Sequence, residues 1–163
     1  MSLSLEPMSL EVLDTLATGD LAAAGRRLGR PVPPDFADGQ WIWQHFAALT
    51  RTEPQLAWWR TQYLVIDTGA IVGHVRLQSP ADREAQLGWH VDATRRGRGI
   101  ATGAALQLVD LARARPEIDR LVALIAPENL PSMRVAEKAG FRPDGEQHHR
   151  YGWLMRRYVL DVP

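Results

Sequence analysis

A basic, glycine-rich turn near the middle of the chain guides the interpretation of the whole sequence, and it reads Arg95-Arg96-Gly97-Arg98-Gly99-Ile100-Ala101-Thr102-Gly103. It lies between a predicted strand over residues 85–91 and a predicted helix over residues 100–113. Glycines let the backbone turn tightly and approach a ligand closely. The first N–H groups of a helix lack partners within it, and the helix dipole favours an anion beside them. The turn therefore predicts a phosphate-binding site at the start of the helix.

The spacing of the turn does not fit two common phosphate-binding loops. A dinucleotide-binding fingerprint needs a third glycine where Thr102 stands, and Asp119 precedes its strand, whereas the ribose-binding acid follows one. A kinase-type or ATPase-type phosphate loop is excluded, because the sequence contains no Gly-Lys-Ser/Thr. A plain basic turn that begins a helix stays open beside the phosphate site, if the turn alone is considered.

The segments on either side of the turn predict a mixed architecture. Upstream, the patterns favour a strand over residues 2–8 and helices over 9–17, 21–28 and 38–50, the last with Asp38 as N-cap. A hairpin of two strands, over residues 58–66 and 70–77, follows them. Downstream they favour a strand, a helix and a closing strand, over residues 121–126, 131–139 and 151–160, with residues 141–147 as candidate partner of the last. This order predicts an α+β fold with a partly antiparallel sheet, not the strict alternation of a doubly wound fold.

The bulk composition limits the function classes. The chain has 163 residues, which suits a single domain over 1–163, and its formal net charge is zero, which argues against binding nucleic acid or an anionic membrane. It has no cysteine, so disulfides, zinc–thiolate sites and an acyl-cysteine intermediate are excluded. No stretch has the length of apolar sequence that a membrane helix needs, and no signal pattern is present, so we expect a cytoplasmic protein.

Three segments, in the same order, resemble motifs of the GNAT superfamily of N-acetyltransferases. Residues 96–101 resemble its pyrophosphate-binding motif, Gln/Arg-x-x-Gly-x-Gly/Ala. The segment Leu87-Gly88-Trp89-His90-Val91-Asp92 resembles its fourth strand, and residues 129–141 resemble its Asn-x-x-Ser…Gly-Phe segment. The resemblance runs from about Ala70 to Phe141. Within the superfamily, the Asn-x-x-Ser segment and the Gly-Trp strand look most like the RimJ/RimL type of acetyltransferase.

The resemblance implies a fold and a cofactor. The fold is a GNAT-like mixed, mostly antiparallel sheet of six to seven strands, splayed between strands 4 and 5 and flanked by helices. Acetyl-CoA is the implied co-substrate, with no metal, and its pantetheine arm would lie between strands 85–91 and 121–126. A bulge around Trp89–Val91 would aim a backbone N–H at the thioester carbonyl. The implied cofactor-binding residues are Trp89, His90, Val91, Arg96, Gly97, Arg98, Gly99, Ile100, Ala101, Thr102, Asn129 and Ser132.

The resemblance also implies catalytic candidates. Ser132 is the candidate proton donor to the departing thiolate, although it could serve only in local hydrogen bonding, and Asn129 could be a helix cap as well as a cofactor ligand. Alternation places Glu84, Gln86 and His90 on one face of strand 85–91. Gln86 stands at the position where family members often carry the glutamate base, and an amide cannot serve as a base. Glu84 and His90 remain candidates for the general base. The alternative for Glu84 is a solvated residue at the end of the strand, and the alternative for His90 is an imidazole packed in the interior.

The acceptor is implied to be a primary amine, either a small molecule or a protein α-amine, with a homodimer possible. A lysine amine is less than about 0.1% neutral at pH 7 and an α-amine roughly a tenth neutral, so a weak base set favours amines of low pKa. The N-terminal helices and the last hairpin would build the acceptor pocket. Because Trp41 and Trp43 cannot share a helix face, we expect one in the core and the other at the pocket. Core packing is the default for all four of these tryptophans, Trp41, Trp43, Trp58 and Trp59.

The predicted function is thus direct acetyl transfer from acetyl-CoA to a primary amine in a ternary complex. His148 and His149, in the last turn, could reach the acceptor mouth. The uncertain base keeps open an alternative from another class, a non-catalytic acyl-CoA sensor on the same fold. A dinucleotide-dependent oxidoreductase is a more distant alternative.

Overall fold

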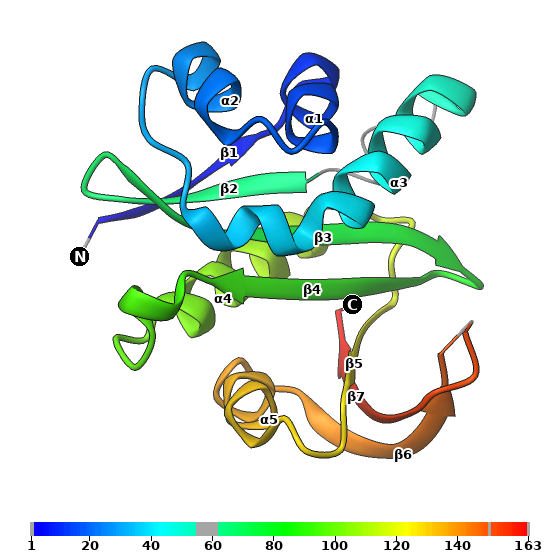
Figure 1. Cartoon of the computed structure of the whole chain (residues 1–163). Coiled ribbons are helices and arrows are strands. Elements are labelled where there is room, and N and C mark those ends of the chain that lie inside the picture. Colours follow the sequence, from blue (N-terminus) through cyan, green and yellow to red (C-terminus); the bar gives the residue numbers. More distant parts are fainter. Residues whose placement is uncertain (1, 55–61, 150, 163) are drawn as a thin grey trace.

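The computed structural model describes residues 2–54, 62–149 and 151–162. In this part of the chain, seven strands form one sheet in the order β1-β2-β3-β4-β5-β7-β6 (Figure 1). Neighbouring strands are antiparallel except β4 and β5, which are parallel. The mostly antiparallel sheet confirms the predicted fold class. The strands are β1 Leu3–Pro7, β2 Gln62–Asp67, β3 Ala70–Ala81, β4 Glu84–Val91, β5 Arg120–Ile125, β6 Arg142–His148 and β7 Leu154–Asp161.

Five α-helices of the described residues flank the sheet: α1 Leu10–Ala17, α2 Leu21–Leu28, α3 Gln40–Thr52, α4 Ile100–Arg113 and α5 Leu130–Lys138. The bounds of α4 are those that the sequence predicts. The helix predicted over residues 38–50 begins later, because a 3-10 helix (η1, Pro34–Gly39) precedes it and buries Phe36. Asp38 is therefore not its N-cap; Gly39 holds that position, without a side-chain hydrogen bond. Trp58, Trp59 and the start of the strand predicted over 58–66 lie outside the described residues.

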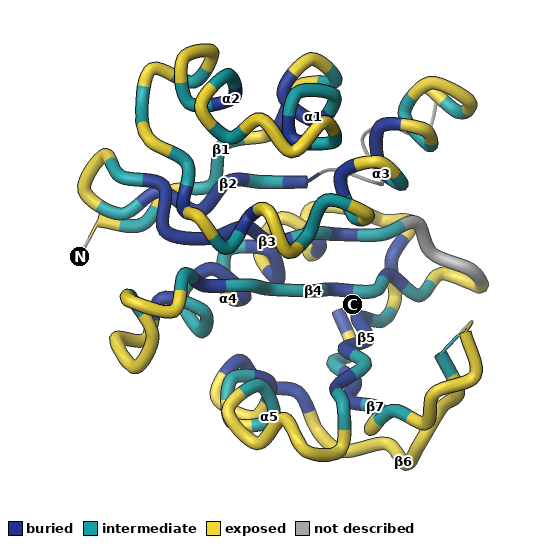
Figure 2. The backbone as a smooth tube through the Cα atoms, viewed as in Figure 1, coloured by how far each residue is buried: buried dark blue, intermediate teal, exposed yellow. Residues whose placement is uncertain are grey.

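Each face of the sheet carries its own apolar core, because successive side chains of a strand point to opposite faces. In β2, Leu64 and Ile66 pack in the core that includes α1 and α3, whereas Val65 packs in the core that includes α4. Figure 2 shows that buried segments run through the central strands β2 to β5. Trp43 is fully buried, and its indole N–H donates to the Phe36 carbonyl oxygen at 2.9 Å. The two faces of the sheet are thus covered by different helices, α1–α3 on one and α4 on the other.

The sheet opens between β4 and β5. Parallel pairing joins Glu84–Leu87 to Arg120–Ala123 and stops there. Beyond that point β4 stays paired with β3, and β5 with β7. This opening confirms the predicted splay between strands 4 and 5.

The expected bulge around Trp89–Val91 is wrong. The register of β3 and β4 runs without a break from Gly73↔Val91 to Gln78↔Gln86. The register shifts instead at Val65/Ile66 in β2 and at Gln78/Ala81, near the β3–β4 turn.

Candidate active site

The open half of β4 presents backbone groups to the gap without any bulge. The Asp92 N–H donates to the Val72 carbonyl oxygen at 2.9 Å, so this opposed pair is hydrogen-bonded. In an antiparallel ladder such pairs alternate, and the intervening residues turn their backbone groups to the other side. Trp89 and Val91 therefore direct their N–H and C=O groups toward the gap, where the Val91 carbonyl accepts from Arg96 Nε at 3.0 Å. Regular strand geometry thus supplies the Trp89 N–H as a donor in the gap.

The glycine turn leads from β4 into α4 in a conformation that favours glycine. Gly97 and Gly99 have φ values of 76° and 77°, and no atom lies within 4 Å of a Cβ placed at either position. Gly99 is the N-cap of α4, so no side chain caps the first turn of this helix. In α5, by contrast, the Asn129 Oδ1 accepts from the Ser132 N–H at 3.2 Å. The uncapped N–H groups of α4 suit a ligand phosphate.

A cavity of about 420 Å³ joins the open half of β4 to these helix starts. It brings together eleven of the twelve residues predicted to bind the cofactor; Arg98 is exposed and is not among the lining residues. We call it the cofactor cavity. Its lining residues are Trp89, His90, Val91, Arg95, Arg96, Gly97, Gly99, Ile100, Ala101, Thr102, Asn129, Pro131, Ser132, Arg134, Val135 and Lys138.

Three basic residues of this cavity were not predicted from the sequence. They are Arg95, in the turn itself, and Arg134 and Lys138, which lie one turn apart on α5 and so share a face. That four-residue spacing on a predicted helix is the pattern that could have revealed the last two. Together with Arg96 they give the cavity a positive charge that suits a polyphosphate. Among the described residues, no group of three or more His, Asp or Glu side chains could hold a metal ion.

His90 has an acidic partner that was not predicted from the sequence. Its Nε2 lies 2.8 Å from Asp35 Oδ2 in η1, and its ring stacks on His74 with the ring centroids 5.1 Å apart. Burial, with smaller effects of His90 and Arg76, holds the pKa of His74 well below its usual range, so His74 is neutral at pH 7. His90 therefore points to the α1–α3 side of the sheet, held between a carboxylate and a neutral imidazole. The register of the β3–β4 hairpin, which places His74 opposite His90, could have suggested this pair.

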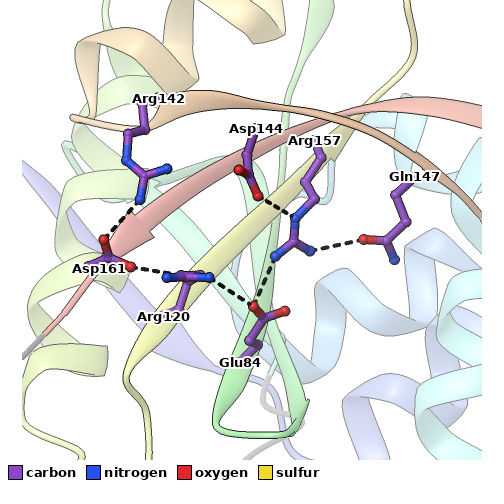
Figure 3. Close-up of polar contacts among 7 residues, drawn as sticks. All are labelled: Glu84, Arg120, Arg142, Asp144, Gln147, Arg157 and Asp161. Atoms are coloured by element: carbon purple, nitrogen blue, oxygen red, sulfur yellow. Dashed lines mark hydrogen bonds and ion pairs between the residues drawn. The ribbon is translucent and has the colours of Figure 1, made fainter.

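Glu84 lies at the other end of β4, in a cluster of ion pairs (Figure 3). Its Oε1 lies 2.9 Å from Arg157 Nη2 and 3.6 Å from Arg120 Nη1. It lies six positions before His90 in β4, which is about 20 Å along a strand. The structure therefore does not bring these two candidate bases together, and it does not place Glu84 in the cofactor cavity.

A second cavity, of about 380 Å³, borders the first half of β4 on the α3 side, and we call it the acceptor cavity after the role that the sequence predicts for this region. Trp41, 54% exposed, His148 and His149 line it, and Trp43 lies in the core. The full lining is Trp41, Ile42, His45, Phe46, Leu49, Arg76, Gln78, Gln86, Leu124, Gln147, His148 and His149. The two cavities reach β4 at Gln86 and Trp89, so that Leu87 and Gly88 lie between them.

Comparisons with known proteins agree with this geometry. The model of the acetyltransferase (GNAT) domain matches residues 3–142. The Bacillus subtilis protein YjcK, named a probable N-acetyltransferase, is 43% identical over 61 residues, which are 37% of this chain and 34% of YjcK. YdaF of the same organism, named provisionally as a ribosomal N-acetyltransferase, is 26% identical over 152 residues, or 87% and 77% of the two chains. The chain thus matches about a third of the length of YjcK.

Solved structures share the fold. RimJ of Mycobacterium smegmatis, in complex with CoA-disulfide, is 24% identical, with a TM-score of 0.69 over 98% of this chain and 82% of that one. RimL, a ribosomal L7/L12 α-N-protein acetyltransferase in complex with coenzyme A, is 16% identical, with a TM-score of 0.71 over 99% and 95%. At these identities the likeness concerns the fold. Since the domain model covers most of its length, the chain belongs to the acetyltransferase (GNAT) domain family and has RimJ and RimL among its structural neighbours.

Proposed function

We propose that the protein is an acetyl-CoA-dependent N-acetyltransferase that moves the acetyl group directly to a primary amine in a ternary complex. The observation that carries the proposal is the meeting of two cavities at one strand. A basic cavity with helix N–H groups and a second cavity on the α3 side reach β4 three residues apart, at Trp89 and Gln86. Two substrates bound in them would meet beside Gly88.

The residues present fit acetyl-CoA, which supplies the thioester for the reaction. The uncapped start of α4 would hold the pyrophosphate, with Arg95 and Arg96 beside it. Arg134 and Lys138 would hold a further phosphate at the rim. The Trp89 carbonyl and the Val91 N–H would bind the pantetheine arm as an added strand, which leaves the Trp89 N–H for the thioester carbonyl.

In the proposed transfer, the chain's own residues act on the developing charge and relay the protons. The amine nitrogen bonds to the thioester carbonyl carbon, the Trp89 N–H donates to the oxygen that gains negative charge, and the C–S bond breaks. Ser132 passes a proton to the leaving thiolate and regains one from water. His90 takes the amine proton through a water, because it lies two residues from Gly88, about 7 Å along the strand. With no cysteine in the sequence, no acyl-cysteine intermediate takes part.

The proposal and its rival, an acyl-CoA sensor, are separated by one experiment. We expect the protein to bind acetyl-CoA in a calorimetric titration, and to release CoA thiol when amines from a broad panel are added. The acetylated product would be identified by mass spectrometry, and a lysine-specific product would count against the preference for α-amines. Binding of acetyl-CoA without thiol release from any amine would support the sensor instead.

A further inference from the structure

The acceptor cavity has an unusual charge for a site that receives an amine. It contains Arg76, three histidines and three glutamines, and its described lining includes no aspartate or glutamate. The carboxylate of β4, Glu84, is engaged by Arg120 and Arg157, and Asp35 is engaged by His90. A polycationic acceptor would therefore meet Arg76 in this cavity and no carboxylate among its described lining residues. Such a mismatch of charge disfavours binding.

Arg76 stands at the point where the two substrates would meet. It is opposite Gly88 in the β3–β4 register. A Cβ placed on Gly88 would lie 2.6 Å from the guanidinium carbon Cζ and 2.8 Å from Nε, so the guanidinium covers Gly88 on the acceptor side. The side chain is partly buried, and it also lines the acceptor cavity. Any side chain at position 88 would displace it.

A guanidinium at this position has two effects on an incoming amine. It stays protonated at any physiological pH, so it opposes an ammonium group and favours the neutral, nucleophilic amine. It also presents a planar fork of N–H donors that matches a carboxylate. An acceptor with a carboxylate near its amine would use both effects at once.

We propose that the preferred acceptor is a primary amine that carries a carboxylate close to the amine, and that Arg76 binds this carboxylate. A free amino acid and a peptide with an acidic first residue share this chemistry. The inference rests on the proposed function and deepens it. Polyamines and other polycations are predicted to be poor acceptors, because they carry the wrong charge for the cavity.

The first test uses the unmodified protein and matched acceptors. The pairs are glycine against glycinamide, and the peptide amide Asp-Ala-Ala against Asn-Ala-Ala, with spermidine as the polycation. Thiol release gives kcat/KM for each, corrected to the neutral fraction of the amine. We expect the carboxylate member of at least one pair to be favoured about tenfold or more, as one charge-assisted pair allows. The first pair reports on free amino acids, and the second on peptide N-termini.

The second test removes the guanidinium. Arg76→Gln should bring the ratio within the preferred pair close to one, and Arg76→Lys should restore part of it. Arg26→Gln, which removes an exposed charge on α2, is the matched control and should keep the ratio. Acetyl-CoA affinity, measured on each variant, shows whether the fold survives.

The outcomes of these tests distinguish a failure of this inference from a failure of the proposed acetyltransferase function. Equal use of both members of each pair by an active protein, or better use of spermidine, would overturn the inference alone. An unchanged ratio in a folded Arg76→Gln variant would do the same. Bound acetyl-CoA with no thiol release from any probe would overturn the proposed function, and the inference with it.

Discussion

The two cavities on β4 are built in opposite ways. Two short segments, residues 89–102 and 129–138, supply every described lining residue of the cofactor cavity, and our proposal gives backbone groups much of the recognition there. The acceptor cavity is assembled from α3, β3, β4, β5 and the end of β6, and side chains dominate it. Backbone recognition requires glycines and helix starts, which a sequence displays as a motif. Side-chain recognition from dispersed elements leaves no such motif, so the acceptor is the harder substrate to identify.

The largest effect is expected from breaking the cofactor cavity alone. In Gly99→Val, a β-branched residue must adopt a left-handed φ, at a cost of about 1–2 kcal/mol, and its side chain obstructs the phosphate position. Loss of two charge-assisted hydrogen bonds would weaken acetyl-CoA binding at least about 100-fold, measured by calorimetry. Gly69→Val is the matched control, because Gly69 has a similar φ of 83° in the β2–β3 turn. It should lower the unfolding temperature similarly and leave acetyl-CoA affinity unchanged; equal losses of affinity would contradict the assignment.

A second test addresses the residue that borders the cofactor cavity and points to the acceptor side. His90→Gln should lower kcat about 100-fold with little change in acetyl-CoA affinity, because it removes proton acceptance. Asp35→Asn should have a smaller effect, since it removes only the partner that orients the imidazole. The measurement is kcat against pH at saturating substrates. A His90→Gln profile of the same shape and height as that of the unmodified protein would show that His90 is not the base.

A third, smaller effect is expected at the leaving group. Ser132→Ala should slow kcat about threefold to tenfold, because a thiol with a pKa of about 8.5 is already a tolerable leaving group. The first turn of α5 should persist, since Asn129 accepts from the Ser132 backbone N–H and not from its side chain. Steady-state kinetics on the true acceptor is the measurement. Unchanged kcat at saturation would remove Ser132 from the mechanism.

The smallest effect concerns the ion pairs beside the acceptor cavity (Figure 3). A hydrogen bond from Arg120 lowers the pKa of Asp161, and one from Arg157 lowers the pKa of Asp144. A lowered pKa in the folded state contributes stability above the unfolded pKa, about 3.9 for aspartate, and this is lost as the pH falls through the folded pKa.

We therefore expect the free energy of unfolding to fall as the pH drops below about 4, and Asp144→Asn and Asp161→Asn each to flatten this dependence slightly. Denaturant unfolding at several pH values measures it. Variants with the slope of the unmodified protein would contradict this account.

Local pattern was enough for elements whose shape depends on nearby residues. The helix over Ile100–Arg113 follows from its glycine start and apolar spacing, and the cap of α5 follows from Asn129. The start of α3 was misplaced, because the two prolines before Asp35 begin a 3-10 helix that buries Phe36. The bulge expected around Trp89–Val91 came from the resemblance alone. It is absent because the β3–β4 register is unbroken there, and regular strand geometry already turns the Trp89 N–H to the gap.

The sequence by itself determined the family and which contiguous segments line one cavity, because these depend on local stretches whose backbone geometry is set by glycines and helix starts. Within the described residues, no helix combines the length and apolar character that crossing a membrane requires. Only the tertiary structure decided that Glu84 joins an ion-pair cluster, that Asp35 and His74 hold His90, and that Arg76 covers Gly88. These contacts join residues from different elements, and strand register and helix packing, which no local pattern specifies, bring them together.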